Sequence, residues 1–266
     1  MRVAVCQFAA GTDVTANTLQ CEQLIGDAGA AGAHLAVLPE ASMYFDAKHS
    51  GGPGPHGQAL DGPFVSAIGA AAARAGIAVL VGMLERADDA DETRDYNTLL
   101  ALNNDGTRLG SYRKIHLYDA FGYRESDDYL SGEIEQPLTF TIGEITVGAL
   151  TCYDLRFPEA FRWVVDAGAD LVALPSAWIV GPAKEHHWRS LVTARAIENT
   201  VYVAAADQIG PVSCGQSIVV DPMGTIIAGA GESMGIAVAE VTPARIAAVR
   251  ERNPSLANRR FAVTPR

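Results

Sequence analysis

The sequence predicts an α/β fold in which two β-sheets pack face to face and helices cover their outer sides. The first observation is that short apolar runs, rich in Val, Ile and Leu, alternate with longer Ala-rich helical patterns. Such runs are typical of strands that are buried on both faces. The second observation is that other runs pair across short turns as hairpins, which a purely parallel sheet does not contain. Together these observations favour a mixed α/β sandwich.

Six apolar runs are predicted to form buried strands, and four helical patterns lie between or after them. The strands cover Arg2–Phe8, His34–Leu38, Ile77–Leu84, Ile145–Thr151, Leu171–Leu174 and Val201–Ala206. The helices cover Asn17–Ala31, Pro63–Ala75, Glu159–Ala167 and Lys184–Asn199. We expect Thr15 at the N-terminus of the first helix. The order of strand, helix and strand indicates parallel strands that are joined by crossovers.

Three hairpins are predicted where a turn of residues that tolerate left-handed backbone separates two strand-like runs. The paired runs are Tyr96–Leu102 with Thr107–Arg113, Leu138–Ile142 with Ile145–Leu150, and Cys214–Val220 with Thr225–Ala228. No linker rich in Pro, Ser and charge divides the chain. We therefore expect a single domain over residues 1–266.

Composition argues against several classes of function. The 266 residues contain 20 Lys and Arg against 31 Asp and Glu, a net charge of −11, and no basic cluster. This balance disfavours nucleic-acid and anionic membrane partners. Four widely spaced cysteines fit neither a disulfide scaffold nor a zinc motif. The start lacks the long apolar stretch of a signal peptide, so we expect a cytoplasmic protein.

Two charged residues follow the ends of predicted strands. Glu40 comes directly after Pro39, where a central strand must stop. Apolar neighbours are expected to raise the pKa of such a carboxyl and to let it act as a base, although an ordinary charge at a loop start is equally consistent. Lys114 lies beside Arg113 at a strand end, where two adjacent cations are more often a solvated edge.

Cys152 is the cysteine most consistent with a reactive role. An apolar strand delivers it to a turn, and Pro158 follows where a helix can begin. Backbone N–H groups at such a turn lower the pKa of a thiol and can hold an oxyanion. The alternative is a buried, inert thiol, which describes Cys6 and Cys21 better. For Cys214 the sequence decides little.

Histidine offers a rival base for a thiol nucleophile, either His116 or His187. Along a strand, His116 shares a face with Lys114, but we favour a supporting or surface role for it. The neighbours His186 and His187 point to different faces of a helix. We therefore predict no metal site.

Taken together, these segments resemble the carbon–nitrogen hydrolase (nitrilase) superfamily. The main motifs are LPE with Glu40, YRKIHL with Lys114 and TCYDLRFPE with Cys152. Further matches are VAVCQF at 3–8, ALPSAW at 173–178, ARAIEN at 194–199, YVAAADQ at 202–208 and GQSIVVDPMG at 215–224. Each motif is weak alone, whereas their order along nearly the whole chain is highly specific.

The resemblance implies a four-layer αββα sandwich, doubled into αββα–αββα by a homodimer or built into a higher homo-oligomer. It also implies a triad in which Glu40 is the general base, Lys114 the electrostatic stabiliser and Cys152 the nucleophile. A second Glu often joins the triad in this family. Glu125 is the best match for it, and Glu133 and Glu135 compete with it.

The resemblance further implies hydrolysis of a small-molecule amide through a Cys thioester, with no cofactor. Nitrilases proper usually have Trp and Glu after the nucleophile, whereas this chain has Tyr153 and Asp154. The sequence CYDLRFPE is similar to the amidase branch of Nit-type ω-amidases, so we expect a small aliphatic or ω-amide as substrate. The segment GPAKEHHW at 181–188 resembles a stretch of that branch but carries an insertion. The alternatives are a nitrilase and a non-catalytic interaction protein that retains the fold.

Four aromatic residues are expected to border the substrate. They are Tyr44, Phe121, Tyr153 and Trp178. The first belongs to a stretch over Ser42–Pro63 that is dense in Gly and Pro. With Lys114, the backbone N–H of Tyr153 is expected to face the oxyanion. Arg156 is a candidate partner for a substrate carboxylate, although we favour an ion pair with Glu159 or Asp154.

Overall fold

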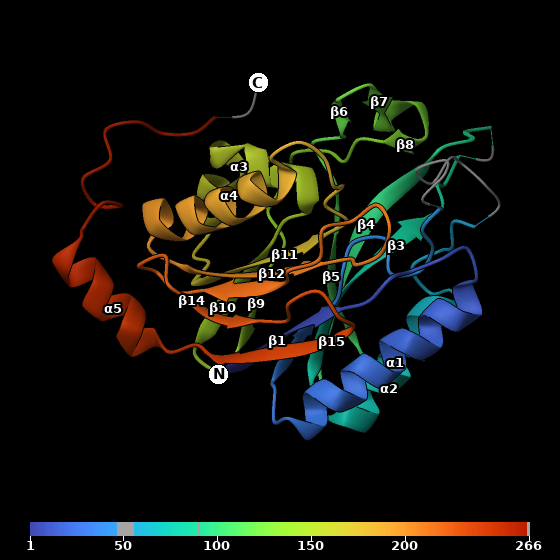
Figure 1. Cartoon of the computed structure of the whole chain (residues 1–266), viewed down its shortest axis with the longest axis horizontal. Helices are drawn as coiled ribbons and strands as arrows, with labels where there is room; N and C mark the ends of the chain where they lie inside the picture. Colours follow the sequence, from blue (N-terminus) through green and yellow to red (C-terminus); the bar gives the residue numbers. More distant parts are fainter. Residues whose placement is uncertain (47–55, 90, 265–266) are drawn as a thin grey trace.

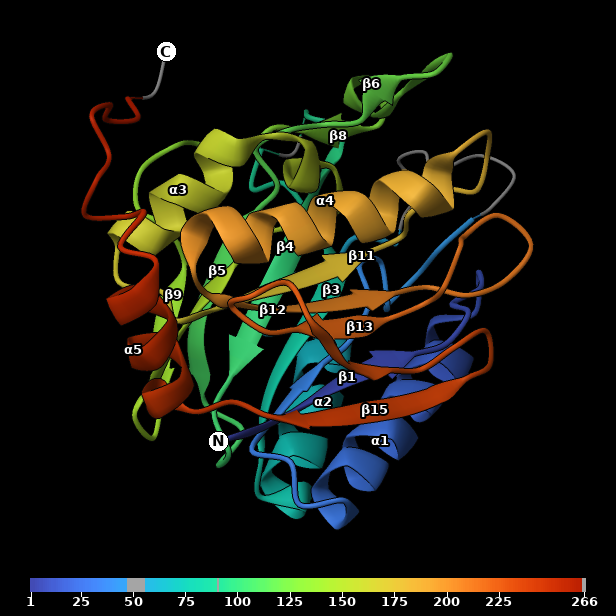
Figure 2. The ribbon, with the colours of Figure 1, turned by 60° about the vertical axis from the view of Figure 1, so that its left-hand side comes forward.

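Two mixed sheets lie face to face in the middle of the molecule, and each is covered on its outer side by two helices (Figure 1, Figure 2). The computed structural model describes residues 1–46, 56–89 and 91–264. The covering helices are α1 (Val14–Ala30) and α2 (Pro63–Ala75) on the first sheet, and α3 (Pro158–Asp166) and α4 (Lys184–Asn199) on the second. The layers therefore follow the order αββα, which confirms the predicted sandwich.

The first sheet takes most of its strands from the N-terminal half of the chain. Its order is β15-β1-β2-β3-β4-β5, and β8 pairs with β4. The bounds are β1 (Arg2–Gln7), β2 (Leu35–Val37), β3 (Ala78–Glu85), β4 (Asp95–Leu102), β5 (Arg108–Arg113), β8 (Tyr129–Leu130) and β15 (Gly235–Glu240). Strands β1 to β3 are parallel, whereas β3, β4 and β5 are antiparallel neighbours. The sheet thus combines a crossover part with a hairpin part.

The second sheet has the order β14-β13-β12-β11-β10-β9. The bounds are β9 (Thr139–Ile142), β10 (Ile145–Ala149), β11 (Leu171–Ser176), β12 (Tyr202–Asp207), β13 (Ile218–Val220) and β14 (Ile226–Gly229). Strands β10, β11 and β12 are parallel, and the outer pairs are antiparallel. A separate small hairpin consists of β6 (Asp119–Ala120) and β7 (Tyr123–Arg124).

The continuous apolar character of β1 follows from its position between two cores. Val3 and Val5 belong to the core between the sheets, whereas Ala4 and Cys6 belong to the core beneath α1 and α2. Successive side chains of a strand point to opposite faces, so a strand that is covered on both sides needs apolar residues at every position.

Most element boundaries lie within two residues of the expectation, and two starting positions differ by more. The first helix begins at Val14, because the Asp13 carboxylate rather than Thr15 caps it, accepting from the Thr15 and Ala16 N–H groups at 2.9 and 3.1 Å. The strand expected from Cys214 begins only at Ile218. Gly215 and Gln216 have φ values of 64° and 57°, and this left-handed backbone interrupts an extended strand.

The sequence analysis missed the short strands β6, β7 and β8, and also one long strand and one helix near the C-terminus. Strand β15 pairs antiparallel with β1 along its whole length, and helix α5 (Pro243–Arg252) follows it. The signal for the helix is present, because Thr242 caps it and Pro243 occupies its first turn. Across the described part of the chain, no helix is long and apolar enough to cross a membrane.

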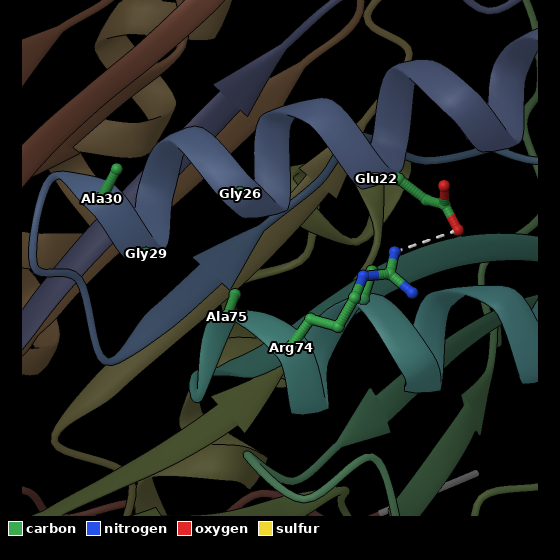
Figure 3. A pocket seen from close by; sticks show the side chains of 7 residues that line it. Glu22, Gly26, Gly29, Ala30, Arg74 and Ala75 are labelled. Atoms are coloured by element: carbon green, nitrogen blue, oxygen red, sulfur yellow. Dashed lines mark ion pairs between the residues drawn. The ribbon is translucent and has the colours of Figure 1, made fainter.

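Helices α1 and α2 approach each other closely because small residues line their contact (Figure 3). A Cβ on Gly29 would lie 3.0 Å from the Ala75 Cβ. Arg74 bridges to Glu22 at 3.4 Å across a shallow hollow of about 310 Å³ (Figure 3). No nucleophilic side chain lines this hollow, so we assign it to helix packing.

Candidate active site

Three predicted reactive side chains line one cavity, although they follow strands of both sheets. Glu40 follows β2 and Lys114 follows β5 in the first sheet, whereas Cys152 follows β10 in the second. The cavity has a volume of about 530 Å³, and Glu125 also lines it. The face-to-face packing of the sheets therefore brings together residues that are far apart in the sequence.

The backbone that carries Glu40 lies against β3 at a glycine. The Gly82 N–H donates to the Pro39 carbonyl at 3.2 Å. A Cβ on Gly82 would lie 2.6 Å from the Ala41 nitrogen and 2.7 Å from the Glu40 Cα. Real Cβ atoms do not approach a backbone so closely, so only glycine leaves room for the Glu40 segment.

We expect Gly82→Ala to lower the free energy of unfolding by about 1–3 kcal/mol, because the added methyl group must displace the Glu40 backbone. The matched control is Gly26→Ala on α1 (Figure 3). No atom lies within 4 Å of the position that a Cβ on Gly26 would take. Gly26→Ala is expected to raise the free energy of unfolding by up to about 1 kcal/mol, because alanine has a higher helix propensity than glycine. Urea denaturation measures the free energy of unfolding of both variants. Equal effects of the two substitutions would contradict the close approach of the Glu40 backbone to Gly82.

The Lys114 ammonium lies between two carboxylates. Its Nζ donates to Glu40 Oε1 at 2.9 Å and to Glu125 Oε1 and Oε2 at 3.0 and 2.9 Å. Lys114 is only 2% exposed, so all three of its N–H groups are used without water. With one cation and two carboxylates, this cluster has a net charge of 1 − 2 = −1 when all three groups are ionised.

Of the three candidates for the second Glu, the structure places Glu125 at Lys114. Glu125 opens the short helix η1 (Glu125–Asp127), and its Oε2 also accepts the backbone N–H of Tyr118. Glu133 and Glu135 are exposed on the loop that follows. Only Glu125 among them lines the cavity.

Cys152 lies at a sharp turn between β10 and the short helix η2 (Cys152–Arg156). Its φ is 41°, a left-handed backbone that costs a non-glycine residue roughly 1–2 kcal/mol. The buried Asp154 carboxylate holds the turn by accepting the Thr151 N–H at 2.8 Å and the Tyr112 hydroxyl at 2.7 Å. The strained turn presents the thiol to the cavity.

The protonation states differ from the sequence expectation. Burial raises the pKa of Glu40, but the Lys114 charge and hydrogen bonds from Lys114, Cys152 and Asn97 outweigh it and hold the pKa below its ordinary value. Burial and the Glu40 charge raise the pKa of Cys152 well above its ordinary value, against the opposing Lys114 charge. The expected raised pKa of Glu40 and lowered pKa of Cys152 were wrong. The resting site holds a carboxylate hydrogen-bonded to a neutral thiol.

Two groups that the sequence analysis missed also hold Glu40. Asn97 on β4 donates through Nδ2 to Glu40 Oε1 at 2.8 Å and to Glu125 Oε1 at 3.1 Å. The backbone N–H of Ala177, after β11, donates to Glu40 Oε2 at 2.8 Å. The available signals were a polar residue inside a buried strand and the ALPSAW motif at a strand end.

Three of the four expected aromatic residues line the cavity, namely Phe121, Tyr153 and Trp178. Tyr44 is the exception, and the prediction that it borders the substrate was wrong. It belongs to the core beneath α1 and α2 and stacks on His56 at 4.0 Å between ring centroids. Its neighbour Phe45 lines the cavity instead. Residues 47–55 of the same predicted loop lie outside the described residues.

Neither candidate histidine base lines the cavity. His116 contacts the Asp154 carboxylate through Nδ1 at 2.7 Å and stacks on Phe157 at 3.8 Å. It therefore supports the turn that carries Cys152. His187 lies 3.4 Å from the Arg156 guanidinium. In residues 1–46, 56–89 and 91–264, no three His, Cys, Asp or Glu side chains gather as metal ligands would.

Arg156 does not make the ion pair that we favoured. The Asp154 carboxylate already accepts the Tyr112 hydroxyl, and no ion pair joins Arg156 to Glu159 in the described structure. Instead, the guanidinium lies over the Trp178 ring, with Cζ 4.9 Å from its centroid. Arg156 therefore lies against an aromatic ring that lines the cavity, but does not itself line the cavity.

Comparison with known proteins extends over nearly the whole chain. The carbon–nitrogen hydrolase family model matches residues 2–251. The chain is 38% identical over 262 residues to the deaminated glutathione amidase of Escherichia coli O157:H7, with 98% of each chain covered. It is 36% identical over 273 residues to the protein of that name from Bos taurus, covering 97% of this chain and 81% of the other.

Solved structures agree with this similarity. The C. elegans NitFhit protein superposes with a TM-score of 0.83 at 28% identity, covering 97% of this chain and 65% of NitFhit. This chain thus spans about two thirds of the length of NitFhit. A cysteine-to-alanine mutant of the Nesterenkonia AN1 amidase gives 0.80 at 27% identity, with 97% of this chain and 95% of that chain covered.

Proposed function

Because the chain belongs to the carbon–nitrogen hydrolase family, we propose that it is an amidase that converts a small aliphatic or ω-amide to a carboxylic acid and ammonia. Its relatives include amidases of E. coli O157:H7 and Nesterenkonia sp. AN1. One structure of the latter carries the acetamide moiety of fluoroacetamide on its active-site cysteine. The observation that carries the proposal is the Cys152 thiol hydrogen-bonded to an ionised Glu40, itself held by Lys114, in one cavity.

In the proposed acylation step, Glu40 takes the thiol proton as Cys152 attacks the amide carbonyl. A resting thiol and a carboxylate with a lowered pKa fit a transfer that occurs only as the new bond forms. The developing oxyanion would face the Lys114 ammonium and the Tyr153 N–H. Glu40 then returns the proton to the departing amine, which leaves as ammonia, and an acyl thioester remains on Cys152.

In the proposed deacylation step, Glu40 takes a proton from water while the water oxygen attacks the thioester. Collapse of the second tetrahedral intermediate breaks the C–S bond, and the proton on Glu40 returns to the thiolate. Glu125 acts through Lys114, which it holds by two hydrogen bonds, and is proposed as a positioning residue. None of these proposed reaction steps requires a cofactor.

Ammonia release from paired amides and nitriles tests the proposal. We expect turnover of short amides and of ω-amides, together with a mass increase on the Cys152 peptide equal to the acyl group. Turnover of nitriles alone would identify a nitrilase instead. Absence of both turnover and adduct across the panel would favour a non-catalytic interaction protein that retains the fold.

We also propose that residues 1–266 form a single domain and that the protein assembles as a homodimer or a larger homo-oligomer in the cytoplasm. The family model that extends over residues 2–251 supports a single unit. Light scattering measures the mass directly, and a monomer at micromolar concentration would contradict the assembly.

A further inference from the structure

The end of strand β12 carries two buried polar residues that the reaction described above does not use. They are Asp207, the last residue of β12, and Gln208, and both are 0% exposed. Gln208 holds the main chain of the base, because its Nε2 donates to the Glu40 carbonyl at 2.8 Å. This bond leaves the direction of the Glu40 carboxylate to other groups.

The two oxygens of the Glu40 carboxylate are held from different sides. Lys114 and Asn97 donate to Oε1 at 2.9 and 2.8 Å, whereas the Ala177 N–H donates to Oε2 at 2.8 Å. A carboxylate that is held at both oxygens keeps one orientation toward the Cys152 thiol, with which it is hydrogen-bonded. The direction of the Ala177 N–H is therefore part of what places the base.

The buried carboxylates of Glu40 and Asp207 accept two consecutive backbone N–H groups. After the Ala177 N–H, which donates to Glu40, the Trp178 N–H donates to Asp207 Oδ1 at 2.7 Å. Only the φ and ψ angles of Ala177 separate the two planar peptide units that carry these N–H groups. Fixing the Trp178 N–H therefore restricts the direction of the Ala177 N–H.

Asp207 is itself fixed by the loop that follows β12. Its Oδ2 accepts the Cys214 S–H at 3.1 Å, and its backbone N–H donates to the Ser217 Oγ at 2.8 Å. Burial and the Asp207 charge raise the pKa of Cys214, so the thiol remains a donor. The Cys214 N–H also donates to the Trp178 carbonyl at 2.9 Å, so the loop closes on the same segment.

A direct effect of the Asp207 charge on Glu40 would have the opposite sign. Burial raises the pKa of Asp207 well above its ordinary value, against the hydrogen bonds that it accepts, and the Glu40 charge raises it further. If the two carboxylates simply repelled each other, removing Asp207 would lower the pKa of Glu40. Loss of the Ala177 hydrogen bond would raise it instead. The other titratable groups around Glu40 are unaltered by a substitution at position 207, namely Lys114, Glu125 and Cys152.

We propose that Asp207 is a positioning residue that, through the Trp178 N–H, orients the Ala177 N–H toward the carboxylate of Glu40. This inference rests on the proposed amidase function, in which Glu40 is the base. Asp207 touches no reacting atom, and it acts through one backbone segment between the two carboxylates.

The test is the pH profile of kcat/KM for amide turnover in Asp207→Ala and Asp207→Asn. Asparagine keeps a carbonyl oxygen for the Trp178 N–H, whereas alanine leaves this N–H without an acceptor. Because kcat/KM falls at low pH as Glu40 becomes protonated, the midpoint of the fall reports the pKa of Glu40. We expect Asp207→Ala to raise this midpoint by about 1–2 pH units, the scale of one hydrogen bond to a charged group. Asp207→Asn is expected not to raise it.

The matched control is Asp221→Ala, which removes another buried carboxylate of the second sheet. Asp221 accepts the Met223 and Thr225 N–H groups, each at 2.9 Å, in the turn between β13 and β14, and does not line the cavity. This change should lower stability and leave the midpoint in place. The inference is overturned if Asp207→Ala leaves the midpoint in place or lowers it, or if Asp207→Asn raises it equally.

A second variant and a second readout keep the inference separable from folding and from the amidase function. If Asp207→Ala does not fold, Asp207→Ser replaces it, because its hydroxyl stops one bond short of the Oδ1 position, and an unaltered midpoint there counts against the inference. If the unmodified protein turns over no amide, the amidase function fails. The modification of Cys152 by methyl methanethiosulfonate, followed by mass spectrometry of its peptide, then replaces turnover, because attack by this sulfur also requires loss of the thiol proton. The same shifts are expected in its pH profile, and their absence would overturn the positioning role.

Discussion

Replacing Cys152 with alanine is expected to lower amide turnover by at least about 10⁴-fold, the scale found when a covalent nucleophile is removed. The reason is chemical, because without sulfur no thioester forms and the reaction must proceed by direct attack of water. The fold should remain, since the change removes one atom at the cavity surface and relieves no ion pair. Turnover and the acyl adduct on the Cys152 peptide are measured on the same samples.

A matched control is Cys21→Ala, which removes a buried thiol from α1, outside the cavity. It is expected to cost about 1 kcal/mol of stability and to leave turnover and the adduct intact. Two results would contradict the assignment. One is retained turnover in Cys152→Ala, and the other is an adduct that persists in that variant on another cysteine.

The positions of the three reactive residues could be predicted because each follows a strand whose end is readable. Pro39 stops the strand before Glu40, and apolar runs deliver Lys114 and Cys152 to their turns. The ordered motifs then favoured one family and its αββα layers. What joins these three residues is long-range packing of two sheets, which no local pattern contains.

The protonation states could not be predicted for the same reason. An isolated carboxyl among apolar neighbours has a raised pKa, but the Lys114 ammonium lies 2.9 Å from Glu40 and reverses the direction. The turn that carries the thiol was predicted correctly, yet burial and then the Glu40 charge oppose ionisation of Cys152. Burial between the two sheets, and the charges of residues that follow other strands, are not contained in the local sequence.

The orientation of side chains on loops could not be predicted from the sequence either. Tyr44 and Phe45 are adjacent in the sequence, but Tyr44 packs in the core whereas Phe45 lines the cavity. The backbone conformation of the loop decides which of the two side chains faces the cavity. Lys184 falls in an insertion relative to the motif it resembles, so its place in the cavity wall had no counterpart in the sequence pattern. The scaffold of the site was therefore more predictable than its specificity.

Lys114→Met is expected to abolish turnover and also to destabilise the protein. The substitution leaves Glu40 and Glu125 facing each other in a buried site, which costs roughly 3–5 kcal/mol at neutral pH. Burial and mutual repulsion then raise the pKa of Glu40, so that it becomes a protonated acid and cannot accept the thiol proton. We expect kcat to fall by at least about 10³-fold, from the loss of a base and of an oxyanion stabiliser.

The pH dependence of stability separates this electrostatic cause from simple loss of packing. In the unmodified protein, the folded pKa of Glu40 lies below its ordinary 4.5 and that of Lys114 above its ordinary 10.5. The ion pair therefore contributes its full stabilisation of the folded protein between the two ordinary pKa values, 4.5 and 10.5. This contribution is lost as pH falls through the folded pKa of Glu40 or rises through the folded pKa of Lys114. In Lys114→Met the folded pKa of Glu40 is raised, so stability is instead lost as pH rises from about 4.5 through that pKa.

Urea denaturation at pH 5 and pH 8 should accordingly show a larger deficit for Lys114→Met at pH 8. Arg74→Met is the matched control, because it removes the exposed ion pair with Glu22 (Figure 3) and should change stability by at most about 1 kcal/mol at either pH. A deficit of the same size at both pH values would mean that Lys114 acts through packing alone. In that case its charge would not be what keeps Glu40 ionised, and the proposed base would need another source of its lowered pKa.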